Sequence, residues 1–229
     1  MRTFRIIGML LNYPTKELVD NLGGLSSVLH DEGVLNAKTI KGVDKLINMM
    51  GKADLMDLQE DYVGLFDRSR AHSLYLFEHI HGESRDRGMA MINLRGHYAE
   101  HGLTLSHKEL PDYLPMFLEF LSILDFKEAQ DLLNETVHIY GAVGAKLKKK
   151  GSLYAALFKA LEAIATVKPD PKFVEAALNE VIDDSLEALD EDWVEPDAFN
   201  GLGEADCGSC SENIRRMGEN LEAEIEVKH

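Results

Sequence analysis

Hydrophobic side chains recur at three- and four-residue steps along most of the chain, the spacing that gathers them on one face of an α-helix. Leu55, Leu58, Tyr62 and Leu65 form one such face, with acidic residues among the positions between them. By the same spacing, helices are predicted over residues 1–11, 16–29, 40–50, 85–101 and 113–124. Alternating apolar runs joined by Asn-Gly or Asp-Gly turns, which mark β-hairpins, do not occur in the sequence. The pattern predicts an all-α, multi-helix bundle.

Helix ends in the second half are marked by residues with capping chemistry. Gly151 follows an apolar stripe that runs from Leu132 to Leu147, and glycine readily adopts the left-handed backbone that closes many helices. Ser152 is placed to cap the next helix. A final helix is predicted after Asp170, because Pro171 is tolerated in a first helical turn. We therefore predict one helical domain over residues 1–193 and a flexible, acidic, glycine-containing tail over residues 194–229.

The amino-acid composition excludes several classes of binding partner. The 229 residues include 24 basic and 40 acidic side chains, which give a formal net charge of -16 at pH 7. This charge repels nucleic-acid phosphates and anionic lipid headgroups, so a basic protein partner is expected instead. No apolar run reaches the roughly 18 residues that a membrane-spanning helix needs. The two cysteines make no disulfide framework, which fits a cytoplasmic protein.

Metal and catalytic motifs are weak. Cys207 and Cys210 have the spacing of half a zinc site, but structural zinc normally takes four protein ligands and no second pair follows. His97 and His101 lie one helical turn apart without the glutamate of a zinc-protease motif at its required place, so a solvated helix surface is favoured. Phosphate-binding glycine loops, dinucleotide fingerprints and nucleophile elbows are missing. The sequence favours a protein that is not an enzyme and holds no cofactor stably. A helical metal-dependent hydrolase or a zinc-stabilised adaptor is the alternative.

Two clusters of polar side chains remain as candidate binding residues. The first surrounds the predicted start of the helix over residues 85–101 and consists of Glu78, His79, His81, Glu83, Arg85, Asp86 and Arg87. Its structural interpretation is a salt-bridged helix start with Ser84 as the N-cap. The second cluster is Pro111, Asp112 and Tyr113, in which Asp112 is placed to cap the helix that follows.

Three segments of the chain resemble one known family. They are residues 61–67 (DYVGLFD), residues 76–88 (LFEHIHGESRDRG) and residues 110–115 (LPDYLP). In this order and spacing they resemble the motifs of the NarJ family, also called the nitrate reductase delta subunit, and the likeness extends over roughly residues 1–190. The family-motif residues of the first segment are Tyr62, Leu65, Phe66 and Asp67.

The resemblance implies a function. Members of this family, within the wider TorD/DmsD/NarJ group of redox-enzyme maturation chaperones, fold as a single all-α domain. They bind the catalytic (alpha) subunit of respiratory nitrate reductase before its cofactors are in place, partly through its N-terminal peptide. They support insertion of the molybdenum cofactor and of iron-sulfur centres before the enzyme docks at the membrane. We accordingly expect this chain to act on a molybdenum-cofactor enzyme as a monomer or weak homodimer that does not insert into the membrane.

Residue roles follow from the same resemblance. A Pro-Asp-His motif belongs to the peptide-binding hinge of the wider group and maps onto Pro111, Asp112 and Tyr113, with tyrosine in place of histidine. An amphipathic client helix would lay its apolar face in a groove and its cationic side chains against an acidic rim. The rim candidates are Glu78, Glu83, Asp86 and Asp112. The remaining client-site candidates are His79, His81, Arg85, Arg87, Pro111, Tyr113 and Phe117, with Met89, Met91 and Met116 as further groove residues.

Overall fold

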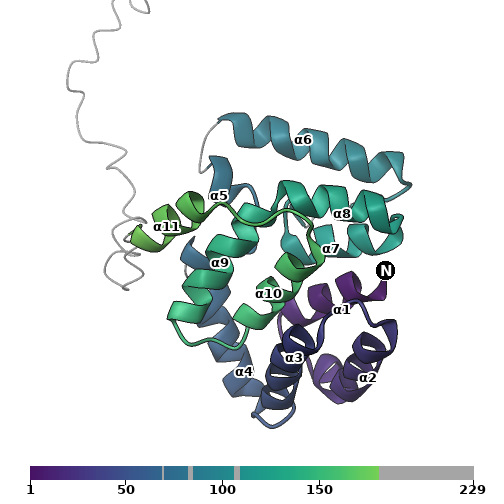
Figure 1. The fold of residues 1–229 in the computed structure, drawn as a ribbon, viewed down its shortest axis with the longest axis vertical. Coiled ribbons are helices and arrows are strands. Elements are labelled where there is room, and N and C mark those ends of the chain that lie inside the picture. The colour runs from purple at the N-terminus through teal and green to yellow at the C-terminus, as the bar shows by residue number, and fades with distance from the viewer. Residues whose placement is uncertain (69, 82–84, 106–108, 181–229) are drawn as a thin grey trace, which may run out of the picture. The chain divides into compact units, whose positions relative to one another are not determined.

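The computed structural model describes residues 1–68, 70–81, 85–105 and 109–180 (Figure 1). Its α-helices are α1 (Arg2–Leu11), α2 (Lys16–Glu32), α3 (Ala37–Met50), α4 (Leu55–Tyr62), α5 (Glu78–His81), α6 (Arg85–Glu100), α7 (Leu114–Ile123), α8 (Phe126–Glu135), α9 (Val137–Lys149), α10 (Ala155–Ile164) and α11 (Pro171–Asn179). Between α4 and α5 lie a π-helical turn, η1 (Val63–Asp67), and a 3-10 turn, η2 (Arg70–His72). The described residues contain no strand, which confirms the predicted all-α class.

Short polar side chains set where several helices begin. Thr15, Asn36, Asp54 and Asp170 each accept a hydrogen bond from a backbone N–H in the first turn of the helix that follows. Such caps satisfy donors that have no partner within the helix. The predicted helix start after Asp170 is therefore confirmed.

Two predicted boundaries need correction. Ser152 caps a turn and not α10, because its hydroxyl accepts from the Tyr154 N–H and the helix begins only at Ala155. The apolar stripe from Leu132 to Leu147 spans two helices, because Thr136 has φ -103° and ψ 1° and leaves helical geometry. The predicted closure at Gly151 is correct, since its φ is 79°.

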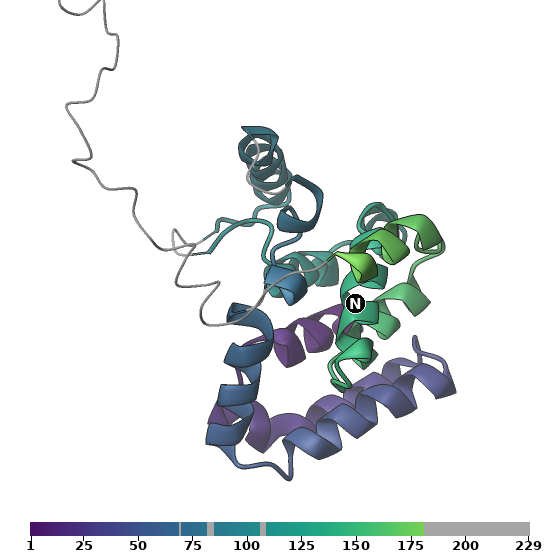
Figure 2. The same cartoon turned by 90° about the vertical axis from the view of Figure 1, so that its left-hand side faces the viewer.

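The hydrophobic core is built by helices that pack in pairs. α1 packs against α7 and α2, α3 contacts α2 and α10, and α9 packs against both α10 and α11. α1 and α7 approach each other closely at Gly8, where an added Cβ would lie 3.0 Å from the Pro115 carbonyl oxygen. Figures 1 and 2 both show α6 at one end of the described region, with α2 and α3 at the other. Within the described part of the chain, no helix is long and apolar enough to cross a membrane.

Candidate functional site

Two of the motif segments, far apart in the sequence, run antiparallel beside each other just before α7. The Leu76 N–H donates a hydrogen bond to the Asp112 carbonyl oxygen at 2.9 Å. The Leu114 N–H donates to the Leu74 carbonyl oxygen at 2.8 Å. Because reciprocal backbone bonds fix the register of two segments, residues 74–76 and 112–114 lie side by side and bring described residues of both motifs into one site.

Asp112 is the buried centre of this site, with 0% of its surface exposed. Its Oδ2 atom accepts a hydrogen bond from the Phe77 N–H at 3.1 Å and lies 3.9 Å from Nη2 of Arg87. Its Oδ1 atom has no hydrogen-bond partner. Burial raises the pKa of the Asp112 carboxyl, although the Phe77 N–H and Arg87 oppose that shift. The site therefore holds a carboxylate that is only partly satisfied.

Two predictions about Asp112 are wrong in structural detail. It does not cap α7, because the N-cap residue is Tyr113 and no side chain there accepts a first-turn hydrogen bond. It also does not lie on an exposed rim, because its carboxylate points into the protein and binds the Phe77 N–H of the neighbouring segment. Both differences arise from the backbone pairing just before α7, which turns the side chain inward.

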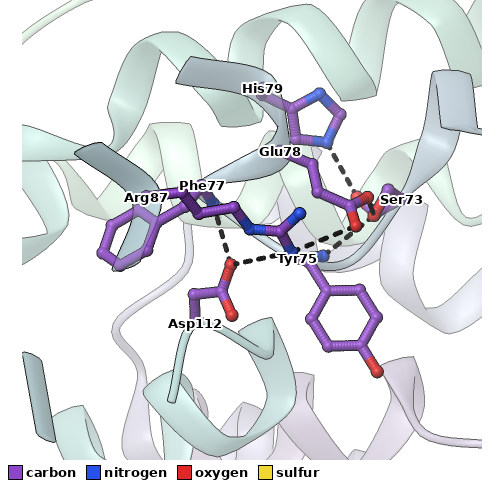
Figure 3. A network of polar contacts seen from close by, with 7 residues as sticks. All are labelled: Ser73, Tyr75, Phe77, Glu78, His79, Arg87 and Asp112. Carbon is purple, nitrogen blue, oxygen red and sulfur yellow. Dashed lines mark hydrogen bonds and ion pairs between the residues drawn. The ribbon is translucent and has the colours of Figure 1, made fainter. Parts of the chain in front are cut away.

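Arg87, in the first turn of α6, points toward two carboxylates (Figure 3). Its Nη2 atom lies 3.2 Å from Oε1 of Glu78 and faces Oδ2 of Asp112. Its Nε atom is buried and has no partner. The other carboxylate oxygen of Glu78 accepts a hydrogen bond from the Ser73 hydroxyl. The predicted salt-bridged helix start is therefore confirmed for Glu78 and Arg87.

His79 closes the other side of this network. Its Nε2 atom lies 2.8 Å from the Ser73 carbonyl oxygen, which only accepts hydrogen bonds, so this nitrogen carries the proton. Burial lowers the pKa of His79, and the hydrogen bond to Ser73 opposes that shift. At neutral pH the imidazole is therefore uncharged and holds the segment before α5 in place.

This burial makes stability depend on pH. Below the ordinary histidine pKa of 6.5, the unfolded chain binds a proton that folded His79 resists, so the free energy of unfolding falls as pH drops. We expect the free energy of unfolding to fall more in wild type than in His79→Gln between pH 7.5 and 5.5. Urea unfolding at the two pH values measures this difference, with His97→Gln on the exposed face of α6 as the control. Equal pH dependence in wild type and His79→Gln would contradict the assignment.

Tyr113 joins the site to α1 and α4. Its hydroxyl donates to Oδ1 of Asn12 at 3.2 Å and lies 3.4 Å from the Tyr62 hydroxyl, which donates to the Leu11 carbonyl oxygen at 2.8 Å. The Tyr113 ring packs 5.4 Å, centroid to centroid, from that of Tyr75. Burial raises the pKa of Tyr113, so this side chain stays neutral and supplies hydrogen bonds without charge.

The first motif segment belongs to the core. Tyr62, Leu65 and Phe66 are buried, and the Phe66 ring lies 4.9 Å from that of Tyr62 and 5.1 Å from that of Tyr154. The π-helical turn that follows Tyr62 supports this cluster. Asp67 is exposed at its end. Tyr62 and Phe66 thus support the site through packing, whereas Leu65 also lines a separate pocket with Leu58, Gly64 and Tyr154.

A groove lies beside the network, between α6 and the segment before α7. Its volume is about 350 Å³. It is lined by Gly88, Met91, Ile92, Arg95, Leu105, Glu109, Leu110 and Pro111. Ile92 is 64% exposed, and Met89 on the same helix is 59% exposed. α6 thus presents apolar side chains that the described residues leave exposed.

The C-terminal half of α6 is attached more firmly. Tyr98 is buried, its hydroxyl donates to the Pro111 carbonyl oxygen at 2.7 Å, and its ring lies 4.7 Å from that of Phe120. Tyr98 and Ser73 are the site residues that the sequence analysis missed. The Tyr98 hydroxyl binds a backbone carbonyl and the Ser73 hydroxyl binds the Glu78 carboxylate five residues later, and neither contact leaves a periodic signal in the sequence.

The other residues predicted to bind the client lie in the core, on the surface or outside the described part of the chain. Phe117 is 3% exposed and belongs to the hydrophobic core, so it is not an open groove residue, while Met116 is half-buried. Asp86 is exposed in the first turn of α6. The residues outside the described part of the chain are Glu83, Ser84, Cys207, Cys210, the side chains of His81 and Arg85, and the predicted tail with its boundary at residue 193.

The histidine pair on α6 has ordinary surface partners. His97 lies 3.6 Å from Glu100, and His101 lies 3.2 Å from Glu128 of α8. This arrangement agrees with the predicted solvated helix surface. Over the residues that the structure describes, no three His, Cys, Asp or Glu side chains are grouped to hold a metal ion.

Comparison with known proteins places the chain in a family. The family model described as "Nitrate reductase delta subunit" matches residues 34–160. The "Nitrate reductase molybdenum cofactor assembly chaperone NarJ" of Escherichia coli (strain K12) is 38% identical over 191 residues, which are 83% of this chain and 81% of that protein. The "Probable nitrate reductase molybdenum cofactor assembly chaperone NarW" of the same strain is 38% identical over 197 residues, 85% of this chain and 82% of that protein.

A solved structure described as "Crystal Structure Of A Putative Redox Enzyme Maturation Protein From Archaeoglobus Fulgidus" is also similar, with 23% identity and a TM-score of 0.46 over 70% of this chain and 91% of that one. The family model spans more than half of this chain, and the E. coli relatives align with most of it. The chain therefore belongs to the nitrate reductase delta subunit family, the family of NarJ.

Proposed function

We propose that this chain is an assembly chaperone for a respiratory nitrate reductase and not an enzyme. It binds the catalytic subunit before the molybdenum cofactor and iron-sulfur centres are in place, and it releases that subunit before membrane docking. The observation that carries the proposal is the 38% identity, over four fifths of both chains, to a protein named as a nitrate reductase molybdenum cofactor assembly chaperone. In this proposal the molybdenum cofactor belongs to the catalytic subunit, and the chaperone does not hold it stably. We further propose that the chain works in the cytoplasm as a monomer or weak homodimer.

The site around Asp112 supports binding of a cationic, amphipathic segment, which we take to be the N-terminal peptide of the catalytic subunit. The network offers two carboxylates, one with an unpartnered oxygen, and the adjoining groove offers exposed apolar surface on α6. Methionine suits such a surface because its flexible side chain adapts to different partners. An amphipathic helix that enters the groove would bury its apolar face and meet the carboxylates with its basic residues.

Local charge matters here more than the bulk charge of the chain. Residues 181–229 hold 15 of the 40 acidic side chains and three of the 24 basic ones, so most of the net charge of -16 lies beyond the described residues. Recognition of a basic segment at the site therefore depends on Glu78 and Asp112 and not on a uniformly acidic helical domain.

Co-purification tests the proposal. The tagged full chain, produced together with the nitrate reductase catalytic subunit but without the other subunits, is expected to retain that subunit in its cofactor-free form. The double variant Glu78→Gln/Asp112→Asn keeps side-chain size and removes both carboxylates, so we expect retention to fall about tenfold. The control is Glu100→Gln/Glu119→Gln, which makes the same charge change at exposed positions. Failure of the wild-type chain to retain the subunit would refute the proposed function.

A further inference from the structure

Arg87 and its partner Asp112 each keep a polar atom without a hydrogen bond. The guanidinium uses one terminal nitrogen for both carboxylates, at 3.2 Å from Glu78 and 3.9 Å from Asp112. Arg87 Nε and Asp112 Oδ1 are both buried and both without a partner. Arginine normally meets a carboxylate through two parallel N–H···O bonds, and buried polar atoms without partners are destabilising. Arg87 therefore lies between the two carboxylates and bonds to Glu78, but it leaves Oδ1 of Asp112 without a partner.

Both carboxylates are held in place without Arg87. Glu78 accepts from the Ser73 hydroxyl, and Asp112 accepts from the Phe77 N–H at 3.1 Å. Figure 3 shows these two anchors on the side chains that face the guanidinium. The pair would keep its arrangement if Arg87 moved away, so it is preorganised for another cation.

Between Asp86 and Ile92, no side chain of α6 is fully buried. α6 is fastened near its C-terminal end by Tyr98, whereas Met89 and Ile92, which follow Arg87, are mainly exposed. Displacement of Arg87 would therefore free the first turns of α6 without removing these side chains from the core. Gly88 and Pro111, the chain neighbours of Arg87 and Asp112, line the groove, so this movement would change its width.

We propose that the carboxylates of Glu78 and Asp112 form a subsite for an arginine side chain of the client, and that Arg87 occupies this subsite as an internal substitute while no client is bound. The inference rests on the proposed function, because the client supplies the arginine. The client guanidinium replaces Arg87 and donates to Asp112 Oδ1, the acceptor that Arg87 leaves unused. A buried carboxylate thus has a cationic neighbour both before and after the exchange, which avoids the large destabilisation of an uncompensated buried charge.

The subsite favours arginine over lysine. A guanidinium is planar and presents several N–H donors at fixed angles, so one group can reach acceptors on both α5 and the segment before α7. An ammonium is a compact point charge that is more strongly hydrated, so it loses more on entering a buried site. The partner segment is therefore expected to be amphipathic and to carry at least one arginine beside its apolar face.

Isothermal titration calorimetry tests whether the client arginine replaces Arg87, because it measures whether loss of Arg87 strengthens or weakens peptide binding. The probes are a peptide of about 16 residues from the N-terminus of the nitrate reductase catalytic subunit, and a copy with neutral, isosteric citrulline at each arginine. If Arg87 fills the subsite about nine tenths of the time, Arg87→Met binds the arginine peptide about tenfold more tightly than wild type. The citrulline copy shows no such gain. Arg5→Met, which loses an exposed arginine of α1, binds as wild type does.

A purely structural role of Arg87 predicts the opposite sign. Weaker or unchanged binding of the arginine peptide by Arg87→Met, or an equal gain with the citrulline copy, overturns the inference. Absence of peptide binding by both wild type and Arg87→Met overturns it as well. In each of these cases, co-purification of the wild-type chain with the catalytic subunit would show that the proposed function survives.

A second variant tests the inference even if Arg87→Met does not fold. Arg87→Lys keeps a positive charge opposite Asp112 but has a single nitrogen, so it competes less well for the subsite. We expect it to bind the arginine peptide about threefold more tightly than wild type. An unchanged or lower affinity in this folded variant overturns the inference.

Discussion

Tyr62→Ala is expected to lower the free energy of unfolding by about 3–5 kcal/mol, the range for removing a buried aromatic side chain. Tyr62 is 3% exposed, and its ring packs against Phe66 at 4.9 Å and edge-on against Tyr13 at 5.6 Å. Its removal leaves a cavity where α4 meets the end of α1. Chemical denaturation followed by circular dichroism measures the change.

Tyr62→Phe is the matched variant, because it keeps the ring and removes only the hydroxyl. That hydroxyl donates to the Leu11 carbonyl oxygen at 2.8 Å, and its loss is expected to cost about 0.5–1.5 kcal/mol. The pair of variants separates ring packing from hydrogen bonding. If Tyr62→Ala left stability unchanged and instead abolished retention of the catalytic subunit, this motif residue would be a binding residue and our structural assignment would be wrong.

Gly141→Ala is expected to destabilise the protein by about 1–3 kcal/mol, the range for overpacking a closely packed site. A Cβ at residue 141 of α9 would lie 2.5 Å from Cβ and 2.7 Å from Cγ of Pro169, and 3.2 Å from Cγ2 of Val174. Pro169 is a rigid ring in the connection before α11, so the clash is relieved only if that connection and α11 move away from α9. Thermal unfolding of the variant measures the loss.

Gly96→Ala is the control, since it makes the same substitution inside a helix where an added Cβ meets nothing within 4 Å. There the higher helix propensity of alanine is expected to raise stability by about 0.5–1 kcal/mol. The two substitutions should therefore shift the free energy of unfolding in opposite directions. An increase in stability for Gly141→Ala would show that α11 does not pack against α9 as described.

The candidate site could be predicted only in part from the sequence. The motif segments identified the right parts of the chain, and Glu78, Arg87 and Asp112 were all among the candidates. Their roles could not be predicted, because the sequence placed Asp112 as an exposed helix cap. In the structure it is a buried acceptor for the Phe77 N–H. Ser73 and Tyr98 were missed because their hydrogen bonds to Glu78 and to the Pro111 carbonyl oxygen depend on how the chain folds between the partners, which no helical spacing indicates.

The sequence by itself determined the helical class, the approximate extent of most helices and the family. These follow from local rules, since helical periodicity, capping residues and short motifs act over a few neighbouring positions. Only the tertiary structure decided that Arg87 faces two carboxylates, that one oxygen of Asp112 has no partner and that Met89 and Ile92 of α6 are exposed. The physical reason is that burial and pairing of these groups depend on the antiparallel contact between residues 74–76 and 112–114, and a contact between segments so far apart leaves no periodic trace in the sequence.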